Sequence, residues 1–199
     1  MMIMGMYLVV AIVGAADMIA DGTDKNTAKY NTESGEFSVQ VPLNADQLDS
    51  ISQIGVETEE KFSFDINVSD TEVLRVMKNR ERINILAVDE GAQAVAYDEV
   101  LIEKRYAETH NLSVGETINI LDKGYRISGI GCAMDYDAPF KEITDISVES
   151  DKFGLAFFTG DEYERIRDKA ENIQETLTYA YSANNKDDEL KNLLADMEF

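Results

Sequence analysis

Alternating apolar and polar residues predict a strand–helix–strand unit near the start of the chain. Residues 36–41 alternate as a half-buried strand does. Residues 43–54 follow as a helix, in which Asn44 is the N-cap and Gln47, three residues later, completes a capping box. Residues 56–68 then form a long strand. The alternate residues that we expect on its buried face are Phe62, Phe64, Ile66 and Val68.

The same order of elements returns near the end of the chain. Residues 153–158 are continuously apolar, as in a buried strand, residues 159–170 predict a helix, and residues 175–182 alternate again. An amphipathic helix over residues 185–199 follows. The two units together predict an α+β fold, in which a split β-α-β layer forms a mixed sheet with helices on one face.

A block of different character separates the two units. Before it, residues 71–79 and 83–90 predict two strands joined by a polar hairpin-like turn or short connection. The block itself, residues 99–146, begins with a strand that leads into a helix and continues with two alternating runs joined at residues 122–124. Gly124 would supply the positive φ that such a turn requires. We interpret the block as a small, mainly β lobe inserted into the α+β layer.

The first residues have a different pattern, because residues 1–20 are apolar apart from Asp17 and no Lys or Arg precedes Lys25. Three interpretations stay open. A secretory signal peptide would have a basic start, which is missing here. A buried core helix would be apolar on one face rather than all round. The third interpretation, which we favour, is the outer end of a transmembrane helix, since the acidic and polar flank that follows suits the outside of a membrane.

Charge excludes some classes of partner. The 199 residues include 18 Lys plus Arg against 39 Asp plus Glu, which gives a formal net charge of -21. Such a surface repels phosphate backbones and anionic lipid, so we expect no nucleic-acid binding. Hydrophobic residues make up 44% of the chain, enough for a packed core. With one cysteine, Cys132, the chain cannot form an internal disulfide.

His110, the one histidine, is the obvious candidate for catalysis or metal binding. A nucleophilic dyad would need Cys132 or a serine beside it, and a zinc site would need several His or Cys ligands. The local pattern indicates scaffold instead: His110 falls in the last turn of a helix, Asn111 suits a left-handed C-cap, and Gly115 makes the next turn. We therefore predict a protein that is not an enzyme and has no cofactor or metal.

The loop over residues 135–140 is the candidate contact surface for a partner, since loops on rigid scaffolds commonly carry function. Its residues with this predicted role are Asp135, Tyr136, Asp137, Pro139 and Phe140. The two aspartates could alternatively help to bind calcium or act as an acid–base pair in a hydrolase. The interpretation that we favour for them is a polar turn on an acidic protein.

Residues 97–139 resemble the extracytoplasmic domain of FtsX/MacB-type ABC transporter permeases. The matching features are an acidic strand–helix (103–111), an L-x-V-G-[DE]-like turn (112–116), and a strand pair that ends in a loop with Tyr and Pro (127–139). The order of the remaining elements is similar too. The turn alone is a weak signal, because many β proteins enter a strand this way, and its value comes from order and context.

The resemblance implies a porter-like α+β subdomain, here residues 21–98 and 147–199, that carries the lobe at 99–146 after the membrane segment at 1–20. It also implies a cell-membrane protein with this domain on the extracytoplasmic side, a cytoplasmic ABC ATPase subunit as partner, and a second permease copy in a dimer. The domain would engage an unknown substrate or partner and transmit ATP-driven motion, within a permease longer than this sequence. The alternative function is a secreted or membrane-anchored non-catalytic binding module.

Overall fold

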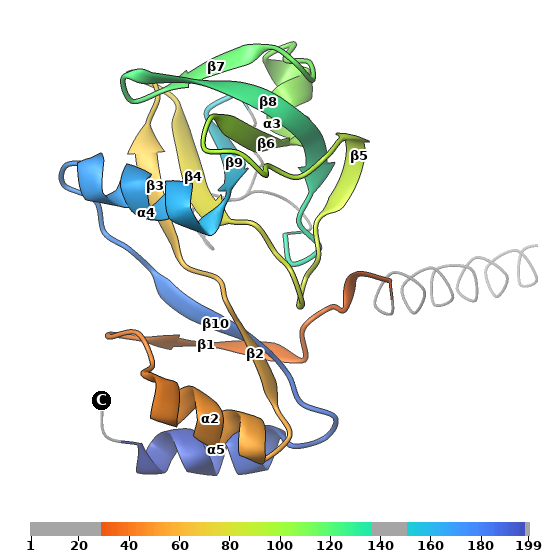
Figure 1. Ribbon diagram of the computed structural model, residues 1–199, viewed down its shortest axis with the longest axis vertical. Coiled ribbons are helices and arrows are strands. Elements are labelled where there is room, and N and C mark those ends of the chain that lie inside the picture. The colour runs from red at the N-terminus through yellow and green to blue at the C-terminus, as the bar shows by residue number, and fades with distance from the viewer. Residues whose placement is uncertain (1–28, 137–150, 198–199) are drawn as a thin grey trace, which may run out of the picture.

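The computed structural model describes residues 29–136 and 151–197, which form two lobes, each built on its own β-sheet (Figure 1). The smaller lobe has a three-stranded sheet in the order β1-β10-β2. The larger lobe has a seven-stranded mixed sheet that curls on itself. The described residues therefore have the mixed α+β fold that the sequence predicts.

The smaller lobe contains the predicted split β-α-β unit. It consists of β1 (Gly35–Val39), α2 (Ala45–Gln53), β2 (Glu57–Glu60), β10 (Leu177–Ser182) and α5 (Asp187–Asp196). Both β1 and β2 pair antiparallel with β10, which occupies the gap between them. The two helices lie next to each other at the far end of the lobe (Figure 1).

The larger sheet follows the order β3-β4-β9-β6-β8-β5, and β7 pairs with β8 beside that path. Its strands are β3 (Ser63–Asn67), β4 (Val73–Lys78), β5 (Ala87–Gly91), β6 (Glu99–Glu103), β7 (Thr117–Ile120), β8 (Lys123–Cys132) and β9 (Phe153–Phe158). Helices α3 (Lys104–Thr109) and α4 (Gly160–Lys169) pack against this sheet. Parallel pairs, β4 with β9 and β6 with β8, make the sheet mixed.

Local signals place helix ends correctly. The Asn44 side chain accepts from the Gln47 N–H at 3.0 Å, and the Asn44 N–H donates to the Gln47 side chain at 2.9 Å. The predicted capping box is therefore confirmed. Thr159 caps α4 by accepting from the Glu162 N–H at 3.3 Å. Asn111 has the predicted left-handed conformation after α3, with φ of 54°.

The predicted role of Gly124 in the β7–β8 turn is wrong. The left-handed residue of this turn is Leu121, with φ of 51°, whereas Gly124 lies within β8. Gly124 pairs with Asn119 in the ladder, and a Cβ there would approach the Thr117 Cγ2 atom to 3.0 Å. The glycine is thus suited to a close cross-strand approach and not to a turn.

Of the two alternatives for the segment between the strands at 71–79 and 83–90, the structure shows a connection and not a hairpin. β4 pairs with β3 and β9, while β5 pairs with β8 across the sheet. Strand β5 begins at Ala87, later than predicted, because Asn84 and Ile85 donate their N–H groups to the carbonyls of Asn31 and Tyr30 instead of pairing with another strand.

The predicted long strand over residues 56–68 divides in two. Its first half, β2, belongs to the small sheet and its second half, β3, to the large sheet, and Lys61 and Phe62 lie between them. The division of the chain into residues 21–98 with 147–199 and the lobe 99–146 stays a prediction. Strand pairing does not follow this division. Strands β3, β4 and β9, from the predicted α+β subdomain, share one sheet with β6 and β8, from the predicted lobe.

One hydrophobic cluster runs through both lobes. It extends from Ile51 and Leu190 under the small sheet, through Phe62 and Tyr179, to Ile127 in the large lobe. A second cluster, which includes Leu155, covers the other side of the large sheet. The residues 1–20 expected at a membrane lie outside the described residues. Among the helices that the structure describes, none is long and apolar enough to cross a membrane.

Replacement of Gly154 tests the packing of α3 on β9. A Cβ at Gly154 would lie 2.5 Å from atoms of the buried Tyr106 ring. We expect Gly154→Ala to lower the free energy of unfolding by about 1–3 kcal/mol in urea titrations, because the ring has no free space to move into. Gly160→Ala is the control, since nothing lies within 4 Å of its Cβ position. Equal unfolding midpoints for the two variants would contradict this packing.

Candidate functional site

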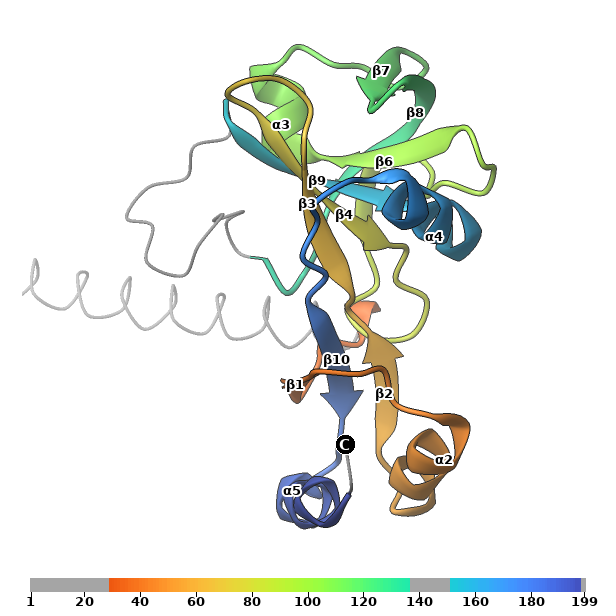
Figure 2. The same ribbon diagram turned by 90° about the vertical axis from the view of Figure 1, so that its left-hand side faces the viewer.

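A two-stranded ribbon carries the chain between the lobes. One segment is the stretch from β2 to β3, and the other leads from α4 into β10 (Figure 2). The Lys61 N–H donates to the Thr178 carbonyl at 2.7 Å, and Ser63 and Thr176 exchange two backbone hydrogen bonds. The ribbon is thus hydrogen-bonded through the point where the two sheets separate.

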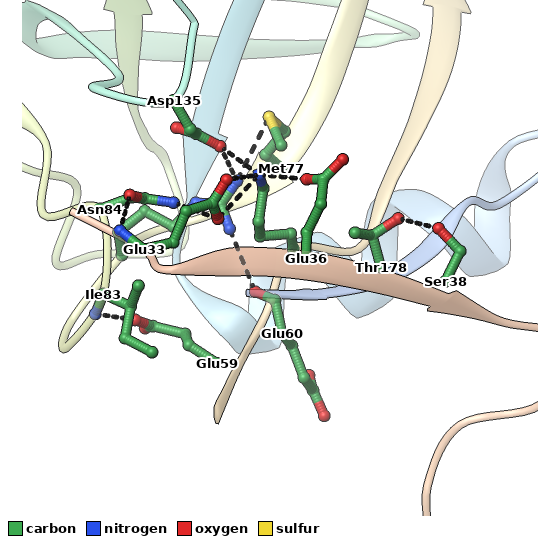
Figure 3. A network of polar contacts seen from close by, with 12 residues as sticks. Glu33, Glu36, Ser38, Glu59, Glu60, Met77, Ile83, Asn84, Asp135 and Thr178 are labelled. Carbon is green, nitrogen blue, oxygen red and sulfur yellow. Dashed lines mark hydrogen bonds and ion pairs between the residues drawn. The ribbon is translucent and has the colours of Figure 1, made fainter. Parts of the chain in front are cut away.

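Lys61 lies at this point, and its side chain is only 6% exposed. Its ammonium group is surrounded by the carboxylates of Glu33, Glu36 and Asp135, whose arrangement Figure 3 shows. Its Nζ atom lies 2.8 Å from Asp135, 2.7 Å from Glu36 and 3.1 Å from Glu33. Asp135 follows β8 in the large lobe, while Glu36 is on β1 of the small lobe. The buried cation therefore joins carboxylates from both lobes.

Arg80 adds a second buried cation beside the first. Its side chain has no exposed surface, and its guanidinium lies 3.7 Å from the Asp135 carboxylate. It also donates to the Glu60 carbonyl at 3.3 Å and approaches the Met77 sulfur. Arg80 comes from the segment after β4, so it connects the large lobe to the outer edge of β2.

The segment that follows Arg80 is held by a carboxylate of the small lobe. The Glu59 side chain accepts from the backbone N–H groups of Glu81, Arg82 and Ile83 at 2.8, 3.0 and 2.5 Å. Asn84, with φ of 53°, then donates to the Glu33 carboxylate at 2.7 Å and accepts from the Glu33 N–H at 3.0 Å. We call the contacts of Lys61, Arg80, Asp135, Glu33, Glu36, Glu59 and Asn84 the ionic joint.

The ionic joint keeps Lys61 charged. Burial lowers the pKa of the Lys61 ammonium, but the charges and hydrogen bonds of Asp135, Glu36 and Glu33 outweigh burial and raise the pKa above its usual range. A raised folded-state pKa gives stability that is complete below the ordinary lysine pKa and is lost only as pH rises through the folded-state value. At neutral pH, the contribution of Lys61 is therefore fully present.

A second buried carboxylate, Glu162, ties α4 to the β7–β8 hairpin. Its side chain is 3% exposed and accepts from the Lys123 ammonium at 2.8 Å and from the Tyr125 hydroxyl at 2.7 Å. Burial raises the pKa of Glu162, but the hydrogen bonds from Lys123 and Tyr125 lower it by more. The carboxylate is thus held ionised among donors, although it lines a cleft of about 810 Å³. This arrangement suits a structural tie better than a general acid, which must carry a proton.

The predicted contact residues have different placements. Asp135 is 1% exposed and belongs to the ionic joint, so its side chain faces the interior in this structure. Tyr136 packs at the edge of the second hydrophobic cluster and interacts with Arg75. Asp137, Pro139 and Phe140 lie outside the described residues. A partner-contact role for the loop stays a prediction.

The structure places His110 and Cys132 in different surroundings. The His110 ring packs against Tyr106 with centroids 4.1 Å apart and ring planes tilted by 31°, and its Nδ1 lies 3.9 Å from Glu72. Burial raises the pKa of the Cys132 thiol, and the carboxylates of Glu103 and Asp89 raise it further, so the thiolate is disfavoured. Within residues 29–136 and 151–197, no group of three or more His, Cys, Asp or Glu is placed to hold a metal ion.

Comparison with known proteins gives a limited result. No protein-family model matches the chain, and no curated protein matches it. Among solved structures, the chain is similar to the periplasmic region of MacB from Actinobacillus actinomycetemcomitans. The similarity has 13% sequence identity and a TM-score of 0.43, and it covers 79% of this chain and 78% of that chain. A likeness at this identity and TM-score says nothing about the activity of this chain.

Asp135→Asn tests the ionic joint. We expect it to lower the free energy of unfolding at pH 7 by about 3–5 kcal/mol, because it leaves Arg80 buried without a carboxylate partner. Asp65→Asn is the matched control: it breaks the Asp65–Arg75 pair, whose Oδ1–Nε distance is also 2.8 Å but whose side chains are 32% and 19% exposed. The control should cost about 1 kcal/mol or less. Equal losses of unfolding free energy for Asp135→Asn and Asp65→Asn in chemical denaturation would contradict an ionic joint whose strength depends on burial.

The variant Glu162→Gln tests whether the Glu162 carboxylate contributes to the pH dependence of stability. A lowered folded-state pKa gives stability above the ordinary glutamate pKa that is lost as pH falls through the folded-state value. The wild-type chain should therefore lose more unfolding free energy than Glu162→Gln when the pH is lowered from neutral into the acid range below the ordinary glutamate pKa. Denaturant titrations at several pH values measure this difference. Parallel pH profiles for the two proteins would show that Glu162 is not a linked group.

Proposed function

We propose that this chain is the extracytoplasmic domain of an ABC transporter permease of the FtsX/MacB type. It would be held on the outer side of the cell membrane, with a cytoplasmic ABC ATPase and a second permease copy as partners of the full-length protein. Its role is to engage a substrate or partner outside the membrane and to transmit ATP-driven motion. The chain itself is proposed to be non-catalytic, with no cofactor.

The sequence resemblance is the first support. The described part of residues 97–139 runs through β6, α3, β7 and β8 in the order that the resemblance implies. The L-x-V-G-E turn connects α3 to β7: the Leu112 N–H donates to the Ala107 carbonyl at 2.8 Å, and Gly115 has φ of 94°. The Glu116 side chain accepts from the Ser113 N–H at 2.9 Å, which closes the turn. The residues that carry the resemblance thus have a consistent local structure.

The ionic joint is the observation that carries the proposal. A domain that relays motion needs contacts that resist sliding when one part is displaced. Buried ion pairs provide such contacts, because a charge that leaves its partners inside the protein has no water to replace them. The hydrogen-bonded ribbon and the shared hydrophobic cluster add two further connections between the lobes. This combination supports a lever more directly than it supports an enzyme.

A coupling experiment tests the proposal in cells that carry the native gene and its neighbouring ATPase gene. A tagged version of the protein should co-purify from membranes with an ATPase. Asp135→Asn should leave ATP hydrolysis by the complex within about twofold of wild type but lower its transport or signalling output about tenfold, because the lobes no longer move together. Asp65→Asn, which breaks an ion pair inside the large lobe, should keep both activities.

Two outcomes would reject the transporter role. One is recovery of the protein from the culture medium with no ATPase in its complexes, which would favour the alternative of a secreted or anchored binding module. The other is equal output from Asp135→Asn and wild type in a complex of normal abundance, which would mean that the ionic joint does not transmit the motion.

A further inference from the structure

A cleft of about 940 Å³ lies between the two lobes. One wall comes from α2 and β2 of the small lobe, and the other from residues 78–82 and 94–95 and the start of α4 in the large lobe. Helices α2 and α4 project to the same side of the strands, one from each lobe (Figure 2). The cleft adjoins the buried ionic joint, because Glu59 and the segment after β4 belong to both.

The cleft has an excess of negative charge. Its two basic side chains are already paired: Lys78 lies 2.8 Å from Glu60 and 3.0 Å from Glu164, and Arg82 lies 3.9 Å from Glu57. Asp49 and Glu81 are exposed on opposite walls, and in the part of the chain that the structure describes neither has an ion-pair partner. The charge that ion pairs leave unbalanced is thus negative on both walls of the cleft.

Apolar side chains lie beside these charges. Val95, on the rim, is 84% exposed, and Tyr97 on the same loop is 63% exposed. Leu48, Val56 and Tyr179 contribute to the lining. Exposed apolar surface beside unpaired carboxylates points to a ligand that brings both a cationic group and an apolar side chain.

We propose that the interlobe cleft binds an extended, cationic segment of a partner protein. Lys or Arg side chains of the segment face Asp49 and Glu81, and an apolar side chain packs on Val95. Nucleic acid and anionic lipid are excluded as occupants by the same negative charge. This inference deepens the proposed function, on which it rests for the partner's role, by naming the chemistry of that partner.

Fluorescence anisotropy of a labelled peptide with alternating lysine and leucine, titrated with the full chain, tests the proposal. The double variant Asp49→Lys/Glu81→Lys should weaken binding about tenfold or more, and Asp49→Asn/Glu81→Gln by an intermediate factor. The matched control Asp70→Lys/Glu108→Lys makes the same change in net charge at exposed positions outside the cleft and should weaken binding less than about threefold. Val95→Ser should weaken binding about threefold without a change in charge.

Specific outcomes overturn the proposal. Equal weakening by the cleft variant and the matched control would mean that the peptide senses only the net charge of the chain. Equal binding of a peptide with glutamate in place of lysine would reject the cationic partner, and unchanged binding by Val95→Ser would reject the apolar contact. Unfolding midpoints check that each variant is folded. Failure here would leave the coupling test of Asp135→Asn unaffected, so the two proposals can fail separately.

Discussion

The burial of one ammonium group, that of Lys61, constrains how the two lobes meet. A charge removed from water must be surrounded by opposite charge and hydrogen bonds, or its free-energy cost exceeds what packing can offset. Here the compensating carboxylates come from Glu33 and Glu36 on one side and from Asp135 on the other. Segments far apart in the sequence are therefore brought to one point, and the position of the ribbon between the sheets is fixed by electrostatics as well as by hydrogen bonds.

This constraint explains two features of the chain around the ionic joint. Residues 56–68 predict one long strand, yet the strand divides at Lys61 because its two halves pair with different partners. Likewise, the polar stretch after β4 has the composition of an exposed turn, yet Arg80 within it is buried, because Glu59 accepts from the backbone N–H groups that follow and Asp135 lies beside the Arg80 guanidinium. In both cases a carboxylate that is distant in the sequence helps to determine the local structure.

The sequence predicts local structure well here and distant pairing poorly. The capping box of Asn44 and Gln47 depends on residues three apart, so it is visible in the sequence, as is the split β-α-β unit completed by β10. The partners of β5 and the conformation of Gly124 depend on strands elsewhere in the sheet, so the sequence leaves the first open and the prediction for the second fails. Asp135 was predicted from its loop composition, which cannot show that Lys61 lies opposite. A lone lysine between an acidic stretch and an apolar strand was the available signal.

The ionic joint and the interlobe cleft adjoin each other along the ribbon and share Glu59, which accepts from the segment after β4 and also lines the cleft. Glu59 and Lys61 face the joint, whereas the Glu60 side chain meets Lys78 in the cleft. The segment after β4 also serves both: Arg80 enters the joint, and Arg82 donates to the Thr58 carbonyl on the edge of β2 beside the cleft. A ligand that displaces Arg82 from β2 therefore acts on the segment that holds Arg80. If the cleft binds the proposed partner, the path from that site to the ionic joint is thus a few residues long and runs through one loop.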